Sequence, residues 1–89
     1  MKSTLDPDFV DLFNQLPADV RRQARISYRH FKSDPFYPAL RFKKVHAQLP
    51  LWSVRIGSHY RAVGVLEDDE IVWQWIGSHA EYDRFLSQF

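Results

Sequence analysis

The residue types best suited to chemistry lie in the second half of the chain: Arg55, Arg61, His79 and Tyr82. The planar guanidinium group of arginine binds phosphate, and histidine exchanges a proton near neutral pH. An aromatic ring can stack on an unpaired base. Such a set could support metal-free RNA cleavage, in which a ribose 2′-OH attacks the adjacent phosphate.

Other kinds of site have less support. The chain has no cysteine, which excludes disulfides and cysteine-ligated zinc. His79, Glu81 and Asp83 could ligate a metal, but they would diverge around a helix, so we expect no metal and no other cofactor. The sequence contains neither a glycine-rich phosphate loop nor a Gly-x-Ser-x-Gly motif.

Charge is distributed unevenly, although the net charge is only +1. No acidic residue occurs between Asp34 and Glu67. A local basic field of this kind attracts polyanions at short range. The alternative is a solvated surface that merely lacks acids. The basic residues inside this stretch are Arg41, Lys43, Lys44, Arg55 and Arg61, together with His46 and His59.

Two helices are expected in the first half of the chain. Asp6-Pro7 is typical of a helix start, because Asp6 can cap free N–H groups and proline suits the first helical position. Apolar residues then recur with helical spacing from Phe9 to Leu16, and a second helix is predicted over residues 17–32. Residues 1–5 could form a short edge strand or a disordered tail.

A strand is predicted over residues 40–45. Within residues 51–76, three further segments have apolar and polar residues in the alternation that is typical of strands. The Gly57-Ser58-His59 turn would place Arg55 opposite Arg61. A turn at Asp68-Asp69 would pair Gly64 with Trp73 and Ala62 with Trp75. These registers put the tryptophans on one face of the sheet and the arginines on the other. Ser78 and Glu81 have the spacing of a capping box, which predicts a C-terminal helix over residues 79–89.

Strand direction would bring Arg55, Arg61 and His79 to one edge of this sheet. We therefore take Arg61 as the phosphate clamp, His79 as the acid or base, and Tyr82 as a stacking or positioning residue. The alternative for His79 is a helix-start residue bonded to a strand end, and for Tyr82 a core residue. The candidate catalytic residues are thus Arg61, His79 and Tyr82, and the candidate RNA- or phosphate-binding residues are Arg41, Lys43, Lys44, Arg55 and His59.

The order of these features resembles the RelE/ParE superfamily of toxins from bacterial type II toxin–antitoxin modules. The resemblance covers most of the chain and rests on the segments LPADVRRQA, FKKV, WSVRIG, YRA and WIGSHAEYDRFL. Arg61 is similar to the phosphate-contacting arginine of that family. Gly77-Ser78-His79 followed by Tyr82 resembles the end of the last strand, where ribosome-dependent members keep histidine, arginine or tyrosine. Ser53 departs from the pattern, because a basic residue is expected there.

This resemblance implies an α+β fold in one domain, residues 1–89. An N-terminal helical hairpin would pack on a curved, mainly antiparallel four-stranded sheet that a short C-terminal helix follows. It also implies a metal-independent endonuclease that cuts mRNA on the ribosome and inhibits translation, with a cognate antitoxin as its protein partner. A DNA gyrase inhibitor of the ParE type and a non-catalytic interaction domain remain alternatives.

The sequence shows no signal peptide, and no stretch approaches the roughly 20 apolar residues that span a bilayer. We therefore expect no membrane partner and a cytoplasmic location.

Overall fold

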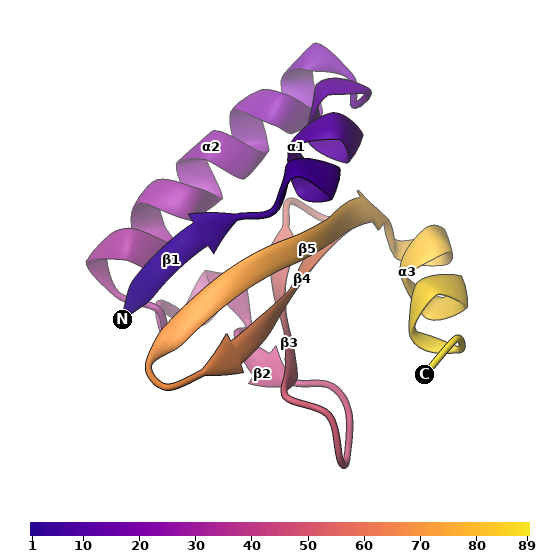
Figure 1. Cartoon of the computed structure of the whole chain (residues 1–89). Coiled ribbons are helices and arrows are strands. Elements are labelled where there is room, and N and C mark those ends of the chain that lie inside the picture. The colour runs from indigo at the N-terminus through magenta and orange to yellow at the C-terminus, as the bar shows by residue number, and fades with distance from the viewer.

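A five-stranded sheet with helices on both faces forms the framework of the protein in a computed structural model that describes residues 1–89 (Figure 1). The spatial order of the strands is β1-β5-β4-β3-β2. Along the chain the elements are β1 (Lys2–Leu5), α1 (Pro7–Asn14), α2 (Ala18–Ser33), the 3-10 helix η1 (Pro38–Leu40), β2 (Lys43–Lys44), β3 (Leu51–Ile56), β4 (Tyr60–Glu67), β5 (Glu70–Ser78) and α3 (His79–Leu86).

The expected four-stranded sheet has a fifth strand, and this strand makes the sheet mixed. Residues 2–5 form β1, which pairs in parallel with β5. Its Ser3 hydroxyl accepts a hydrogen bond from Trp73 Nε1 at 3.1 Å and lies 2.9 Å from the Tyr28 hydroxyl. These bonds tie the start of the chain to both the sheet and α2. The edge strand is therefore part of the fold, and the helical pair follows it instead of opening the chain.

The two predicted helices are confirmed, with small changes at their ends. The Asp6 side chain accepts a hydrogen bond from the Asp8 N–H at 2.9 Å, and Pro7 is the first helical residue. α1 packs over β5, and α2 lies over β3 and η1 (Figure 1). In the second helix Val20, Ala24 and Phe31 are buried.

The strand expected over residues 40–45 is mostly absent. Pro38–Leu40 forms η1 instead, and Arg41 adopts the left-handed conformation with φ 48°. Only Lys43 and Lys44 pair with β3. Proline favours a helical first turn, and the left-handed residue reverses the chain, so extended pairing cannot begin before residue 43. Leu40 and Phe42 are nevertheless buried.

The pairing of β3 with β4 agrees with the prediction, including Arg55 opposite Arg61. The β4–β5 pairing agrees only up to Gly64 opposite Trp73. An irregularity between Val63 and Gly64 then shifts the register, so Trp75 pairs with Val63 and not with Ala62. A β-bulge moves the following side chains to the other face. Trp75 therefore lies on the face opposite Trp73, which corrects the prediction that all tryptophans share one face.

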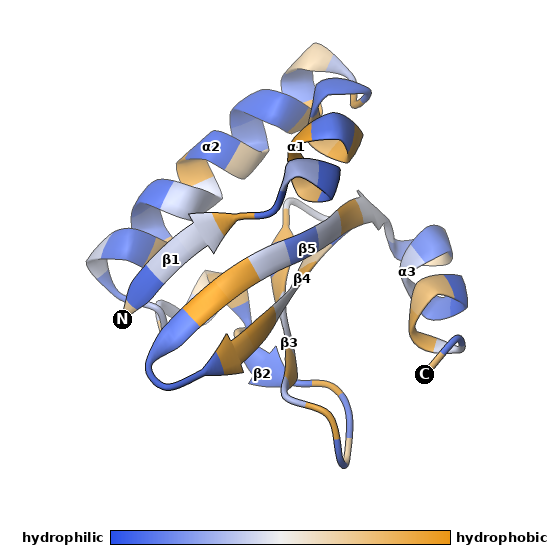
Figure 2. Ribbon diagram, viewed as in Figure 1, coloured by the Kyte–Doolittle hydropathy of each residue, from blue (hydrophilic) through white to orange (hydrophobic).

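The main core lies between the sheet and the α1–α2 pair. Phe31 is only 2% exposed and meets Phe42 and Trp73 edge-on, with ring centroids 5.1 Å and 5.3 Å apart. Gly64 leaves room for this packing, because a Cβ there would lie 2.8 Å from Ile71 Cγ1. Hydrophobic residues appear along β4 and β5 in Figure 2.

A second, smaller core covers part of the opposite face. α3 lies on that side, and its Tyr82 packs with Leu51 and Val63, with Trp75 at the margin. The face that carries Arg55 and Arg61 is thus partly covered and not an open basic surface. The C-terminal helix also ends at Leu86, before the predicted end at residue 89.

Candidate functional site

The start of α3 fixes the position of His79. Ser78 ends β5 and caps α3, so His79 is the first helical residue. Its backbone N–H donates to the His59 carbonyl at 2.7 Å, which ties the β3–β4 turn to the helix start. The His79 side chain is exposed at this junction. This hydrogen bond holds the β3–β4 turn and the start of α3 together at one edge of the sheet, as the sequence predicted.

Arg61 is held from two sides on β4. A terminal nitrogen of its guanidinium group donates to the Ser53 hydroxyl at 3.3 Å. Its Cζ lies 5.2 Å from the ring centroid of Tyr82. Ser53 is fully buried, so its hydroxyl is a fixed acceptor. Arg61 itself is half-buried, which leaves part of its guanidinium group accessible to an anion.

Tyr82 connects Arg61 with His79. Its ring is nearly parallel to that of His79, with centroids 5.9 Å apart and an interplanar angle of 18°. Tyr82 is only 7% exposed. A ring covered to this degree offers little free surface to a base, so its geometry favours the positioning role over the stacking role. Arg61, Tyr82 and His79 form a contiguous group, which we call the Arg61 group.

The remaining basic candidates lie at different distances from this group. Lys43 pairs with Ser53 and therefore lies on the same face as Arg61, whereas Lys44 pairs with Trp52 and lies on the other face. His59 is exposed in the β3–β4 turn. Of the two lysines, only Lys43 is placed to contact a ligand that is bound at Arg61.

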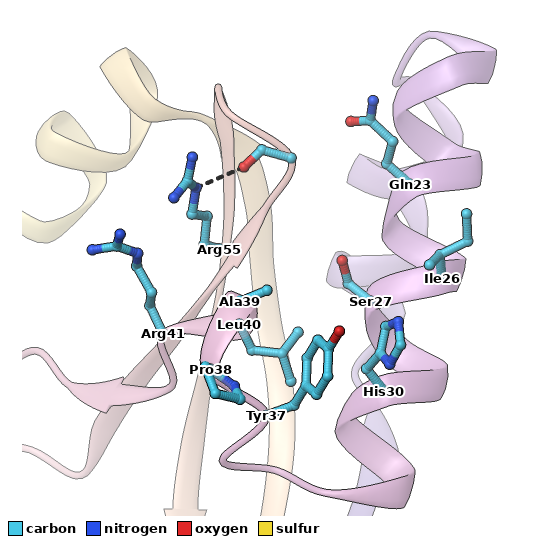
Figure 3. A pocket seen from close by; sticks show the side chains of 11 residues that line it. Gln23, Ile26, Ser27, His30, Tyr37, Pro38, Ala39, Leu40, Arg41 and Arg55 are labelled. Carbon is cyan, nitrogen blue, oxygen red and sulfur yellow. Dashed lines mark hydrogen bonds between the residues drawn. The ribbon is translucent and has the colours of Figure 1, made fainter.

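Arg41 and Arg55 line a groove between α2, η1 and the β3–β4 turn (Figure 3). Arg55 is opposite Arg61 in the sheet, and its Nε donates to the Gly57 carbonyl at 2.8 Å. Arg55 therefore touches both the groove and the Arg61 group's face. His30 and Tyr37 line the same groove but were not predicted from the sequence, because the helix ends between them, before Pro35, and no regular spacing connects them.

None of the basic candidates forms an ion pair within the protein. The salt bridge that the chain does form joins the N-terminal amine to Asp69, 4.0 Å apart, at the far turn. Two arginines on neighbouring strands repel each other when nothing lies between them. Their charges are therefore available to an anionic ligand, which would relieve this repulsion.

The structure holds no group of three His, Cys, Asp or Glu side chains that could bind a metal ion. None of its helices is both long and apolar enough to cross a membrane.

The capping box beside His79 predicts a pH dependence. Glu81 accepts a hydrogen bond from the Ser78 N–H at 3.0 Å, and the Glu81 N–H donates to Ser78 Oγ at 3.2 Å. These bonds with Ser78, with a smaller contribution from Arg84, lower the pKa of Glu81. Because the folded-state pKa lies below the unfolded one, Glu81 stabilises the fold above about pH 4.3, and this contribution is lost as the pH falls through the folded-state pKa.

Glu81→Gln tests this effect, because glutamine keeps the capping acceptor and does not titrate. We expect the wild type to lose more thermal stability than Glu81→Gln between about pH 5 and pH 3, because only the wild type protonates at this position. Thermal unfolding of both proteins, followed by circular dichroism, measures the difference. Identical pH dependence in the two proteins would contradict the assignment.

Comparisons with known proteins agree on one kind of fold. The family described as "ParE-like toxin domain" matches residues 18–84. The RelB–RelE antitoxin–toxin complex from Methanococcus jannaschii contains a similar chain, with a TM-score of 0.73 and 18% identity over 92% of this chain and 98% of that chain. The YoeB/ParE toxin from Agrobacterium tumefaciens gives a TM-score of 0.68 and 18% identity, covering 89% of this chain and 99% of that chain.

The isolated E. coli RelE toxin is similar over 98% of this chain and 96% of its own, with a TM-score of 0.66 and 16% identity. At such identities these likenesses show the fold alone. No curated protein sequence matches the chain.

Proposed function

The chain belongs to the ParE-like toxin domain family, and on that premise we propose that it is the toxin of a type II toxin–antitoxin module that cleaves mRNA on the ribosome. The observation that carries this proposal is the Arg61 group. A half-buried arginine, held by Ser53 and Tyr82, and an exposed histidine at the end of the last strand both pack against the Tyr82 ring.

Arg61 supplies the electrostatic part of the reaction. As the ribose 2′-OH attacks the adjacent phosphorus, negative charge builds on the phosphate oxygens. A guanidinium group that is already fixed in place stabilises this charge without reorganising. The hydrogen bond to Ser53 and the contact with Tyr82 provide such fixation.

His79 supplies proton transfer. Cleavage forms a bond between the 2′-oxygen and phosphorus and breaks the bond from phosphorus to the 5′-oxygen of the next nucleotide. The 2′-OH loses a proton, the 5′-oxygen gains one, and a 2′,3′-cyclic phosphate results. Histidine changes charge near neutral pH, which suits either transfer. Parallel packing against Tyr82 orients the imidazole ring, and Lys43 binds the neighbouring backbone.

A cognate antitoxin is the proposed protein partner. The similar chains from Methanococcus jannaschii and other organisms were solved in antitoxin–toxin complexes. The unpaired basic residues around Arg61 would attract an acidic partner segment. The proposal expects the neighbouring open reading frame to encode a small acidic protein that also binds DNA.

Induction of the protein in growing cells tests the function. We expect the wild type to stop protein synthesis, measured by incorporation of a labelled amino acid. The Arg61→Ala/His79→Ala double variant should leave incorporation near the uninduced rate, because it lacks both the phosphate clamp and the proton donor or acceptor. The double variant must accumulate as a folded protein for the comparison. Equal arrest by the two proteins would rule out this mechanism.

DNA gyrase inhibition is the second candidate, and the ParE-like description of the matching family favours it. It requires binding without RNA chemistry. Under this alternative, induction would trigger DNA-damage signalling while mRNA stays intact.

A further inference from the structure

The groove beside Arg55 has the chemistry of a nucleotide site. It has a volume of about 660 Å³ between α2, η1 and the β3–β4 turn, and none of the residues of the Arg61 group lines it. Polar and charged side chains line most of it: Gln23, Ser27, His30, Tyr37, Arg41 and Arg55. Figure 3 shows the α2 side chains on one side of the groove and the two arginines on the other.

An aromatic pair lies at one end of the groove. The rings of His30 and Tyr37 are parallel within 2°, with centroids 4.3 Å apart. Tyr37 is 39% exposed, in contrast to the buried Tyr82. An exposed aromatic ring that a neighbouring ring already holds flat is a stacking platform for a base. Tyr37 thus offers the surface that Tyr82 lacks.

Arg41, which lines the groove, has an unfavourable backbone conformation. Its φ of 48° and ψ of 45° are left-handed, a conformation that glycine adopts more readily than any residue with a Cβ. Arg41 also has no ion-pair partner. An arginine in a position that favours glycine indicates that the guanidinium group serves something other than the turn.

Arg55 on β3 connects the groove with the Arg61 group. Arg55 lines the groove and lies opposite Arg61, and directly opposed strand residues are about 5 Å apart. Beyond residue 53, β3 has no partner on its β2 side, so Arg55 stands at an open sheet edge. Gly57 follows in a left-handed turn that packs close to Gln23 and closes the groove at that end.

We propose that this groove binds a second nucleotide of the same single-stranded RNA, adjoining the one held at Arg61. Arg41 and Arg55 bind the phosphate, and the base stacks on Tyr37. Gln23 and Ser27, which carry donors and acceptors, contact the edge of that base. The proposal rests on the proposed function, because it takes RNA as the ligand, and it adds a specificity site outside the reacting group.

A binding experiment tests the groove without requiring cleavage. The probe is a fluorescein-labelled six-nucleotide oligoadenylate, and its Kd for the full-length protein is measured by anisotropy at fixed salt. Tyr37→Leu should raise the Kd by about tenfold, the loss of one stacked base. Tyr37→Trp should retain wild-type affinity. Arg41→Gly should also weaken binding, yet its thermal stability should not fall, because glycine accepts the left-handed conformation.

Arg22→Ala is the matched control, because Arg22 is an exposed α2 arginine that does not line the groove. Its Kd should stay close to that of the wild type. Wild-type affinity in both Tyr37→Leu and Arg41→Gly would overturn the proposal that the groove binds RNA. An equal loss of affinity in Arg22→Ala would also overturn it, because the loss would then reflect the overall positive charge of the protein.

The fate of mRNA after induction is measured separately. Intact mRNA with groove-dependent oligoadenylate binding would reject the cleavage mechanism and keep the groove. Cleaved mRNA, together with oligoadenylate binding that the groove substitutions do not change, would keep the cleavage mechanism and reject the groove as a binding site.

Discussion

Arg61→Ala is expected to reduce mRNA cleavage by roughly 10²–10³-fold, the loss typical for removing one preorganised donor from a developing oxyanion. The reason is geometric: Arg61 is fixed by Ser53 and Tyr82 before the substrate arrives. Arg61→Lys should retain part of the activity, because lysine keeps the charge but loses the planar, bidentate geometry. Cleavage by the purified protein on translating ribosomes, followed by primer extension, measures the rates.

The matched control for this prediction is again Arg22→Ala, which removes the same charge from an exposed position on α2. It should cleave at the wild-type rate. Arg61→Ala also leaves the buried Ser53 hydroxyl without this partner, so its unfolding should be measured in parallel. A well-folded Arg61→Ala protein with wild-type cleavage would show that Arg61 is not the phosphate clamp.

Phe31→Ala is expected to have the largest effect on stability, about 3–5 kcal/mol of unfolding free energy. Phe31 is 2% exposed and contacts both Phe42 and Trp73 edge-on, so truncation would open a cavity between α2 and the sheet. A chain of this length has a total stability of about 4–13 kcal/mol. The variant should therefore lose at least about a fifth of the total, which urea unfolding can measure.

The conservative control is Phe31→Leu, which keeps most of the volume and should lose about 1–1.5 kcal/mol. In thermal unfolding, Phe31→Ala should lower the Tm by at least about 12 °C. A loss below about 1 kcal/mol for Phe31→Ala would show that α2 does not close the core in the way described.

Local patterning was enough to predict the elements nearest the site. Alternation along residues 51–56 and 60–67, with a three-residue turn between them, led to the correct pairing of Arg55 with Arg61. The cap at Asp6 and the capping box at Ser78 also follow from side-chain chemistry within a few residues. Features that depend on neighbours in sequence are the ones that sequence predicts well.

Features that depend on distant contacts were predicted less well. The edge strand at residues 1–5 was one of two alternatives, and its parallel pairing with β5 depends on Ser3 meeting Trp73, 70 residues away. The bulge that moves Trp75 to the other face lets it pack against α3, and no local signal marks it. Arg41 adopts a left-handed backbone conformation that arginine rarely takes, so its residue type does not predict it. The bulge determines which face Trp75 occupies, and Arg41 lines the groove.

The bulge has a direct consequence for the site. With Trp75 on the α3 face, the helix finds an apolar surface on which Tyr82 and Phe85 can pack, and the Trp75 and Phe85 rings stack 4.8 Å apart. Tyr82, packed on this face, contacts Arg61. The register shift that moves Trp75 to the α3 face therefore helps to position Tyr82 at the site.

Cleavage of mRNA by this protein is tested by a map of mRNA 5′ ends in cells after induction of the wild type or the Arg61→Ala/His79→Ala double variant. We expect new 5′ ends inside translated coding regions soon after induction of the wild type, and none after induction of the double variant. Arrested cells that express the wild type and keep their mRNA intact would contradict it.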